Sequence, residues 1–232
     1  MIPKIIHQTA RSIDISWEER RLVKRMQCKL YDWNYMFHDD NDNENLIAEY
    51  FPQYLDRFRK IPKGVAKADI CRLVYMYIYG GFYFDTDYKL FSEIPSWMLE
   101  YESLLMESRN SPIEYKLGNA ILASSPGCIF FKDLICYIFE KGELENLAEN
   151  RVELVTGPEA VTDFYLKNKD SYKNIVEVIP RRFFNPPTHL RGFYINKSDD
   201  CIGAHLCWSS WRSGSILNRM LILLQRKLQA LL

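Results

Sequence analysis

The sequence has no excess of charge of either sign, because 30 Lys and Arg residues are matched by 30 Asp and Glu residues. A balanced chain gives no general electrostatic attraction to nucleic acid or to an acidic polymer. We therefore expect no nucleic-acid partner, and any charged ligand has to be held by a local group of side chains.

Long apolar runs are also absent. The most apolar segment, Met220 to Leu224, is far shorter than the roughly 20 residues that span a bilayer, and Gln225 follows it. The opening residues MIPKIIHQTA do not show the basic stretch, long apolar core and cleavage site of a secretory signal. These features predict a cytoplasmic protein with no transmembrane segment.

The six cysteines show neither the spacing of a zinc site nor a dense framework, which predicts free thiols in a reducing compartment. There is no internal repeat and no low-complexity linker. A chain of 232 residues can bury one sizeable core. We expect a single domain over residues 1–232, with a smaller lobe on the acceptor side.

Apolar periodicity predicts alternating strands and helices at the start of the chain. Strands are expected at residues 2–8 and 33–38, a helix at 16–30, an acidic turn at 39–43 and helices at 44–50 and 63–79. Gly80 and Gly81 end the last of these helices, and a strand at 82–84 follows. Further strands are expected at 103–106, 117–123 and 175–179, helices at 129–141, 158–167 and 214–232, and an ordered loop at 181–192. This order is typical of an α/β fold.

The segment GGFYFDTDYKL places Asp85 and Asp87 one residue apart at the end of an apolar aromatic run. On an extended strand, side chains two residues apart point to the same side, so both carboxylates could face one divalent cation. The alternative is a turn in which the two side chains cap backbone amides, and for an isolated Asp-x-Asp this alternative is the favoured interpretation.

Asp69 and Arg72 lie three residues apart on the preceding helix and therefore share one face. They could point toward the region around the aromatic strand. The alternative is an exposed ion pair with no function.

The whole segment KADICRLVYMYIYGGFYFDTDYKL resembles the sugar-binding DxD region of glycosyltransferase family 32. This group includes capsular polysaccharide synthesis proteins and yeast-type mannosyltransferases, and it is similar to the clostridial glucosylating toxins. Three other segments also resemble the family, in its order along the chain: IPKIIHQT, LGNAILASSPG and HLCWSSW.

The resemblance implies a GT-A-like, Rossmann-type α/β glycosyltransferase fold. It implies retaining transfer of a sugar from a nucleotide diphosphate donor, such as a UDP-linked hexose or N-acetylhexosamine, to a hydroxyl of a glycan or glycolipid in capsular or surface polysaccharide synthesis. It also implies a Mn²⁺ or Mg²⁺ cofactor held by Asp85, Asp87 and His205. The catalytic residues implied are Asp85, Asp87, Asp69 and Arg72, and the donor-binding residues are Gln8, Thr9, Asp69, Arg72, Asn119, Ser210 and Trp211.

One position departs from the family. Ala10 stands where the family usually has an aromatic residue that stacks on the base of the donor, so the resemblance does not specify the base. A single His at the end of a first strand is more often structural than catalytic, and His7 is therefore left out of the site.

Two other functions stay open at this point. A phosphohydrolase of the haloacid-dehalogenase type also places Asp-x-Asp after an apolar strand, but normally near the start of the chain and with Thr or Val where this sequence has Lys89. A non-catalytic carbohydrate- or cation-binding module would use the same carboxylates without turnover. The C-terminal helix has leucines on one face, so it either packs against the core, as we expect, or makes a peripheral membrane contact at the inner face of the membrane.

Overall fold

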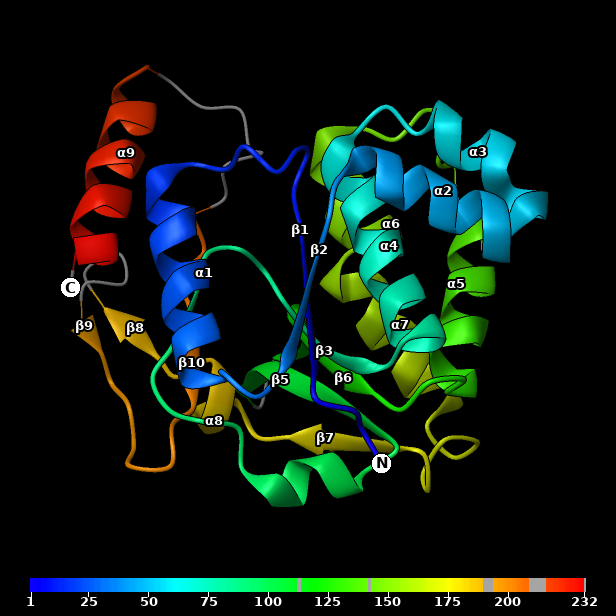
Figure 1. Ribbon diagram of the computed structural model, residues 1–232. Coiled ribbons are helices and arrows are strands. Elements are labelled where there is room, and N and C mark those ends of the chain that lie inside the picture. The colour runs from blue at the N-terminus through cyan, green and yellow to red at the C-terminus, as the bar shows by residue number, and fades with distance from the viewer. Residues whose placement is uncertain (112–113, 142, 190–193, 209–215, 232) are drawn as a thin grey trace.

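The structure of the protein, a computed structural model, describes residues 1–111, 114–141, 143–189, 194–208 and 216–231. Its centre is a six-stranded mixed sheet with the strand order β2-β1-β3-β6-β5-β7 (Figure 1). The strands are β1 (Ile5–Thr9), β2 (Asn34–His38), β3 (Gly81–Phe84), β5 (Ser103–Ser111), β6 (Glu114–Ser124) and β7 (Val176–Ile179). Strand β1 pairs in parallel with β2 and β3, and β7 in parallel with β5, whereas β6 is antiparallel to both of its neighbours.

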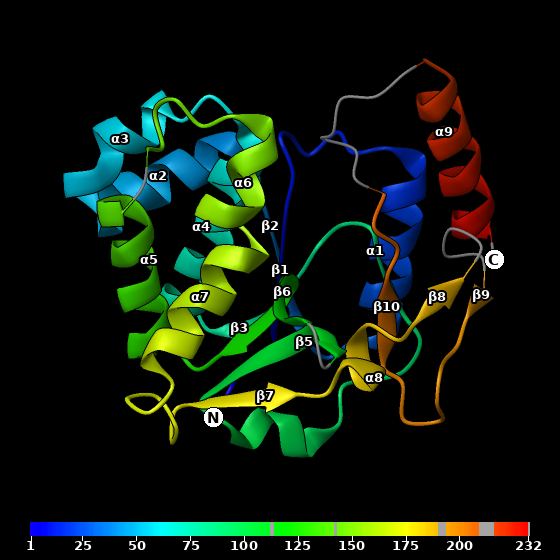
Figure 2. The ribbon, with the colours of Figure 1, turned by 180° about the vertical axis from the view of Figure 1, so that it is seen from behind.

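Helices lie on both sides of this sheet, as the two opposite views show (Figures 1 and 2). One side carries α2 (Asp40–Tyr50), α3 (Leu55–Lys60), α4 (Gly64–Ile78), α5 (Ile129–Lys141), α6 (Val152–Val155) and α7 (Pro158–Asn168). The other side carries α1 (Trp17–Lys29), α8 (Arg181–Phe184), α9 (Ile216–Leu231) and two small sheets, β4 (Tyr88–Leu90) with β10 (Gly203–His205) and β8 (Thr188–His189) with β9 (Tyr194–Ile195). Three short 3₁₀ helices complete the described chain: Pro52–Tyr54, Ser96–Glu100 and Glu149–Arg151.

The sheet buries both faces, because successive side chains of a strand point to opposite sides. Along β3, Tyr83 packs into the apolar cluster beneath α4, α5 and α7, while Phe82 and Phe84 pack into the cluster on the side of α1. All three rings are at most 1% exposed. The continuous apolar run before Asp85 is thus explained by burial on both faces.

Gly80 and Gly81 set the path from α4 into β3. Both have positive φ, +64° and +91°, which glycine adopts without strain. A Cβ atom on Gly81 would lie 2.5 Å from the carbonyl oxygen of Ile5. The glycine pair therefore lets β3 approach β1 closely, and Asp85 leaves the sheet at the carboxyl ends of these parallel strands, where open α/β sheets bind ligands.

Three of the expected element boundaries are wrong. The predicted acidic turn at 39–43 is the first turn of α2, which starts at Asp40 because Asp39 and Asp42 form a reciprocal capping box. The predicted loop at 181–192 contains α8 and the start of the β8 and β9 pair. The strands predicted at 103–106 and 117–123 are parts of a longer hairpin, β5 and β6.

His7 and His38 form a buried pair between the parallel strands β1 and β2 and helix α4. The Nε2–H of His7 donates to the carbonyl oxygen of Gly80 at 2.9 Å, so its Nδ1 accepts from Nε2 of His38 at 3.0 Å. The ring of Tyr75 stacks on His38 with 4.0 Å between centroids. Burial lowers the pKa of His7 to about 3 and the pKa of His38 to about 4. His7 is thus buried and hydrogen-bonded within the fold, in agreement with leaving it out of the site.

Replacing His38 with Asn is expected to remove part of the acid sensitivity of the fold. The unfolded chain binds a proton at His38 below pH 6.5 and the folded chain does not until about pH 4, so the stabilisation decreases as the pH falls through this window. The difference in free energy of unfolding between wild type and His38→Asn should shrink by about 2 kcal/mol between about pH 7.5 and about pH 5. Urea denaturation at both values measures it, and a difference that does not change with pH would contradict the assignment.

Candidate functional site

A cleft of about 1120 Å³ opens at the carboxyl ends of β1 and β3. Residues of α1, α4, β6, β10 and the turn after β3 line it, so the cleft collects side chains from distant parts of the sequence. Its volume is slightly above the range of about 300–1,000 Å³ that is typical of ligand pockets. A nucleotide sugar and part of a second substrate would fit in such a space.

The Asp85-Thr86-Asp87 segment is a turn between β3 and β4. The amide of Tyr88 donates to the carbonyl oxygen of Asp85 at 3.1 Å, which closes the turn. The predicted geometry, an extended strand with both carboxylates on one face, is therefore wrong. The carboxylates still converge, because β10 pairs antiparallel with β4 and places His205 opposite Tyr88, next to Asp87.

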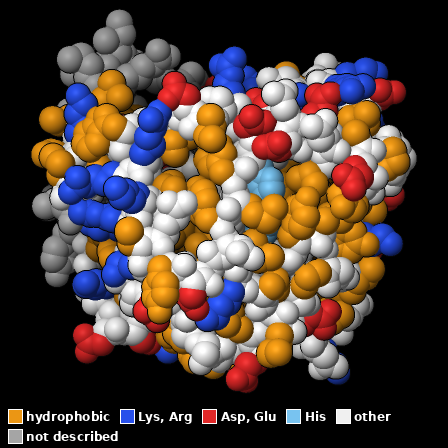
Figure 3. Space-filling model, in the orientation of Figure 1, with side chains coloured by type: hydrophobic (Ala, Val, Ile, Leu, Met, Phe, Trp, Pro, Cys, Tyr) orange, Lys and Arg blue, Asp and Glu red, His pale blue; other side chains and the backbone are white. Residues whose placement is uncertain are grey.

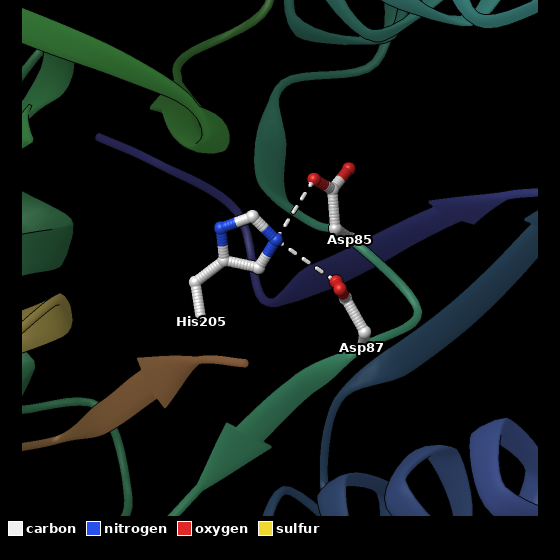
Figure 4. A group of neighbouring side chains, drawn as sticks. All are labelled: Asp85, Asp87 and His205. Atoms are coloured by element: carbon white, nitrogen blue, oxygen red, sulfur yellow. Dashed lines mark ion pairs between the residues drawn. The ribbon is translucent and has the colours of Figure 1, made fainter. Parts of the chain in front are cut away.

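Asp85, Asp87 and His205 direct one ligand atom each toward a common point (Figure 4). Nε2 of His205 lies 2.9 Å from Oδ1 of Asp87 and 3.5 Å from Oδ2 of Asp85. One ligand atom from each residue lies within 4.8 Å of the other two. The structure thus brings together the three residues that the family resemblance implies as metal ligands.

The second oxygen of each carboxylate is held by the scaffold. Oδ1 of Asp85 accepts the hydroxyl of Tyr83 at 2.6 Å, and Oδ2 of Asp87 accepts the amide of Trp208 at 2.8 Å. The alternative in which the carboxylates cap backbone amides therefore holds for one oxygen of Asp87, Oδ2. Since these bonds fix the carboxylates, the other two oxygens are aimed at His205.

This donor set fits a divalent cation. Two carboxylate oxygens and one imidazole nitrogen suit Mn²⁺ or Mg²⁺, with open positions for the oxygens of a diphosphate. Burial raises the pKa of Asp87, but the imidazolium of His205 and the Trp208 amide outweigh it and lower the pKa of this carboxyl. Burial lowers the pKa of His205, yet Asp87 raises it well above the usual value. The cluster therefore has a negative potential that attracts positive charge.

Asp69 lies beside this cluster in a buried polar group. Its Oδ1 accepts Nδ2 of Asn119 at 2.8 Å and lies 3.3 Å from Arg72, and its Oδ2 accepts the hydroxyl of Thr156 at 3.0 Å. The side chains of Asp69 and Arg72 are 6% and 7% exposed, which excludes the exposed ion pair considered from the sequence. Burial raises the pKa of Asp69 to about 6, although Arg72 opposes it.

Arg72 connects the two groups. Nη1 donates to the carbonyl oxygen of Asn119 at 2.7 Å and lies 3.2 Å from Oδ1 of Asp85. Its guanidinium also lies over the ring of Tyr83, 4.6 Å from the centroid. With these partners, Arg72 positions Asp69, Asp85 and Asn119 relative to one another.

Thr156 is the residue of this group that the sequence interpretation missed. It is fully buried just after α6 and holds Asp69 from the side opposite Asn119. The only local signal is its position before Gly157 and Pro158, where the chain turns between α6 and α7. A hydroxyl in such a turn usually caps backbone groups, so its contact with a residue 87 positions away could not be expected.

Of the remaining predicted donor-binding residues, one lines the cleft, one is buried and two lie outside the described residues. Thr9 and Ala10 line the cleft. Gln8 is fully buried, donates to the carbonyl oxygen of Asp85 at 3.1 Å and accepts the hydroxyl of Tyr35 at 2.9 Å. Ser210 and Trp211 lie outside the described residues. A role in donor binding stays a prediction for all of these residues.

Residues 16–104 match the family model described as the glycosyltransferase sugar-binding region containing DXD motif. This part of the chain is similar to the sugar-binding region of the DXD glycosyltransferases. This region includes α1, α4, and the Asp85-Thr86-Asp87 turn, and hence two of the three residues of the candidate metal site. The family resemblance drawn from the sequence is thereby confirmed.

Two relatives and one solved structure extend this result. Inositol phosphoceramide mannosyltransferase 2 of Schizosaccharomyces pombe is 28% identical over 75% of this chain and 49% of its own length. The uncharacterized glycosyltransferase L373 of Acanthamoeba polyphaga mimivirus is 26% identical over 91% of this chain and 84% of its own length. The PaToxG glycosyltransferase is similar in structure, with a TM-score of 0.58 and 17% identity over 73% of this chain and 71% of that chain.

The structural likeness to PaToxG confirms the predicted α/β glycosyltransferase fold. The chain spans about half the length of the Schizosaccharomyces pombe relative. Since the family match covers the Asp-x-Asp turn itself, the interpretation as a haloacid-dehalogenase phosphohydrolase loses its basis.

Proposed function

We propose that this protein is a metal-dependent, retaining glycosyltransferase that moves a hexose from a nucleotide diphosphate donor to a hydroxyl of a glycan or glycolipid. The main support for this proposal is that a candidate metal cluster and a buried polar group lie in the same cleft. The carboxylate and imidazole cluster of Asp85, Asp87 and His205 lies next to the buried polar group of Asp69 and Asn119, with Arg72 in contact with both. A nucleotide diphosphate sugar has the same two parts, an anionic diphosphate and a polyhydroxylated ring.

Asp85, Asp87 and His205 would hold Mn²⁺ or Mg²⁺. When bound, such an ion supplies positive charge that offsets the negative charge growing on the leaving diphosphate. Asp69 would accept hydrogen bonds from hydroxyls of the donor sugar, and the amide of Asn119 would supply an additional polar contact. Because Arg72 fixes both residues, the anomeric carbon is presented in one orientation.

The transfer we propose keeps the configuration at the anomeric carbon. The bond from the anomeric carbon to the phosphate oxygen breaks while the acceptor oxygen bonds to the same face of the sugar. The proton of the acceptor hydroxyl goes to the departing phosphate oxygen, and positive charge on the ring develops as in other glycosyl transfers. Both described carboxylates of the metal cluster and Asp69 are engaged with protein groups, which supports a route without a covalent sugar intermediate.

The proposal also includes a class of sugar donor and a class of acceptor. The family resemblance implies a UDP-linked hexose or N-acetylhexosamine, and the name of the Schizosaccharomyces pombe relative adds nucleotide-linked mannose to the donors to be considered. Charged residues of β5, β6 and α6 also line the cleft and offer a site for an acceptor: Glu107, Arg109, Lys116 and Glu153. Capsular or surface polysaccharides and glycolipids, modified in the cytoplasm, are the acceptors we propose. The presence of all six cysteines as free thiols agrees with that compartment.

Incubation of the purified protein with UDP-glucose, UDP-N-acetylglucosamine and GDP-mannose tests the proposal. Release of nucleoside diphosphate from one donor, dependent on Mn²⁺ or Mg²⁺ and abolished by EDTA, is the expected result. Cleavage of an aryl phosphate instead would favour a phosphohydrolase. Donor binding in the presence of metal, without release or transfer to any glycan acceptor, would favour the non-catalytic module.

A further inference from the structure

Helix α9 is attached to the rest of the protein along one side. Nη2 of Arg226 donates to the hydroxyl of Ser16 at 2.9 Å, and the Arg226 guanidinium lies over the ring of Trp208, 4.7 Å from its centroid. The indole N–H of Trp208 donates to Oε1 of Gln229 at 2.6 Å, and Ala230 is fully buried. The expectation that the C-terminal helix packs against the core is thus confirmed for this face of the helix.

The opposite side of α9 is apolar and exposed. Its exposed leucines are Leu223 (51%), Leu224 (57%), Leu228 (42%) and Leu231 (56%). Their spacing of one, four and three residues places them on one face of a helix, and Lys227 lies among them. A packed terminal helix of a soluble protein usually presents polar residues to water. An exposed row of leucines therefore indicates a surface that binds a partner.

The neighbouring helix α1 surrounds this apolar face with positive charge. Helices α1 and α9 lie side by side in both views of the ribbon (Figures 1 and 2). The exposed charged residues of α1 are all basic: Arg20, Arg21, Lys24 and Lys29. Its two acidic residues face inward, Glu18 at 4% exposure and Glu19 beside Arg226 at 3.4 Å.

The space-filling view shows the same arrangement. Lys and Arg side chains gather over α1 and α9 on this face, next to hydrophobic side chains (Figure 3). Arg20 pairs with the exposed Asp14, which leaves a net excess of basic groups on the surface. We call the exposed leucines of α9 together with Lys227 and the exposed basic residues of α1 the α1–α9 surface.

We propose that the α1–α9 surface binds a bilayer that contains anionic phospholipids. An interfacial helix lies in the plane of the membrane, with its apolar face among the acyl chains and basic residues at the level of the headgroups. Lys and Arg residues near such a surface are attracted by anionic lipids. None of the helices in the described part of the chain is both long and apolar enough to cross a bilayer.

Charge selects the membrane over a second copy of the chain. A symmetric dimer through the leucines of α9 would bring the basic side of one α1 close to that of its partner, because the same surface is used on both subunits. An anionic bilayer instead offers apolar and negatively charged partners at the same place. The proposal uses no residue of the metal cluster and does not depend on the transferase activity.

Flotation of the full chain with lipid vesicles tests the proposal. Binding is expected to vesicles of phosphatidylcholine with phosphatidylserine, to weaken with increasing NaCl, and to be much weaker with phosphatidylcholine alone. A variant with Leu223→Ser, Leu224→Ser and Leu228→Ser should lose affinity by about tenfold or more. The charge-reversed variant Arg21→Glu with Lys24→Glu should lose the preference for phosphatidylserine.

Two matched controls separate this surface from general effects of sequence change. Leu166→Ser replaces a leucine of α7 that is 46% exposed, and Lys169→Glu with Lys173→Glu changes the net charge by the same amount away from α1. Both should bind vesicles like the wild type. Equal vesicle binding by the leucine variant and wild type would overturn the proposal. The proposal would also be overturned if light scattering without lipid showed a dimer for the wild type and a monomer for the leucine variant.

Discussion

Replacing Asp87 with Asn is expected to lower metal-dependent sugar transfer by about a hundredfold or more, with little change in the fold. Asn has the same shape and can still accept the amide of Trp208, which lies 2.8 Å from the present carboxylate. It removes the negative charge that faces His205 and Asp85, and with it a strong ligand for the cation. Nucleoside diphosphate release and Mn²⁺ titration by calorimetry measure the two effects.

A carboxylate on a neighbouring surface provides the control for this experiment. Asp200 lies on the loop before β10 and pairs with Arg182 at 3.1 Å in an exposed position. Asp200→Asn should leave both metal affinity and transfer unchanged. If Asp87→Asn behaved like this control, or if the wild type kept its full rate in excess EDTA, the metal assignment would be wrong.

Replacing Asp69 with Asn should reduce transfer by roughly ten- to a hundredfold, because a hydrogen bond to a charged group contributes about 1.5–3 kcal/mol. The new amide oxygen can accept from Asn119 and Arg72 while its NH₂ group donates to the hydroxyl of Thr156, which turns its own proton to the carbonyl oxygen of Val152, so the free energy of unfolding should change less than transfer does. The loss is expected in the turnover of donor rather than in metal affinity, since we propose that Asp69 contacts the donor sugar and it is not one of the three residues of the metal cluster. Donor kinetics and thermal unfolding of the same samples give both values.

Thr156→Val supplies the comparison, because Val has nearly the shape of Thr but cannot donate to Asp69. This change should cost about 1 kcal/mol of stability and reduce transfer less than Asp69→Asn does. If Asp69 served only to hold the fold, the ranking of the two variants by loss of transfer would be reversed. Thr156→Val would then reduce activity at least as much as Asp69→Asn, in proportion to the loss of stability.

The path of the chain into the site could be predicted from the sequence. The apolar periodicity of α4, the glycine pair and the buried aromatic strand are local signals, and the structure confirms their order. The start of α2 was not predicted correctly, since Asp39 and Asp42 form a capping box in a stretch that also has the composition of a turn. Composition alone does not distinguish a helix cap from a turn, because the same residue types serve both.

The geometry of the candidate site depends on contacts between distant residues. Asp85 and Asp87 were correctly placed near each other, but for the wrong reason, because they lie in a turn and not on a strand. His205 reaches them through the pairing of β10 with β4, two strands more than 100 residues apart in the sequence. No periodicity encodes that pairing, and the resemblance to a known family was the only indication of it.

The contacts of the Arg72 guanidinium with residues on both sides of it matter for any attempt to change the donor preference that we propose for this protein. Asp69, Asn119 and Asp85 all contact it, so a substitution on one side of Arg72 disturbs the balance of charge on the other. The effects of such substitutions should be strongly non-additive in double-mutant cycles. Engineering of donor preference would therefore start better at a cleft position outside this ionic network, such as Ala10.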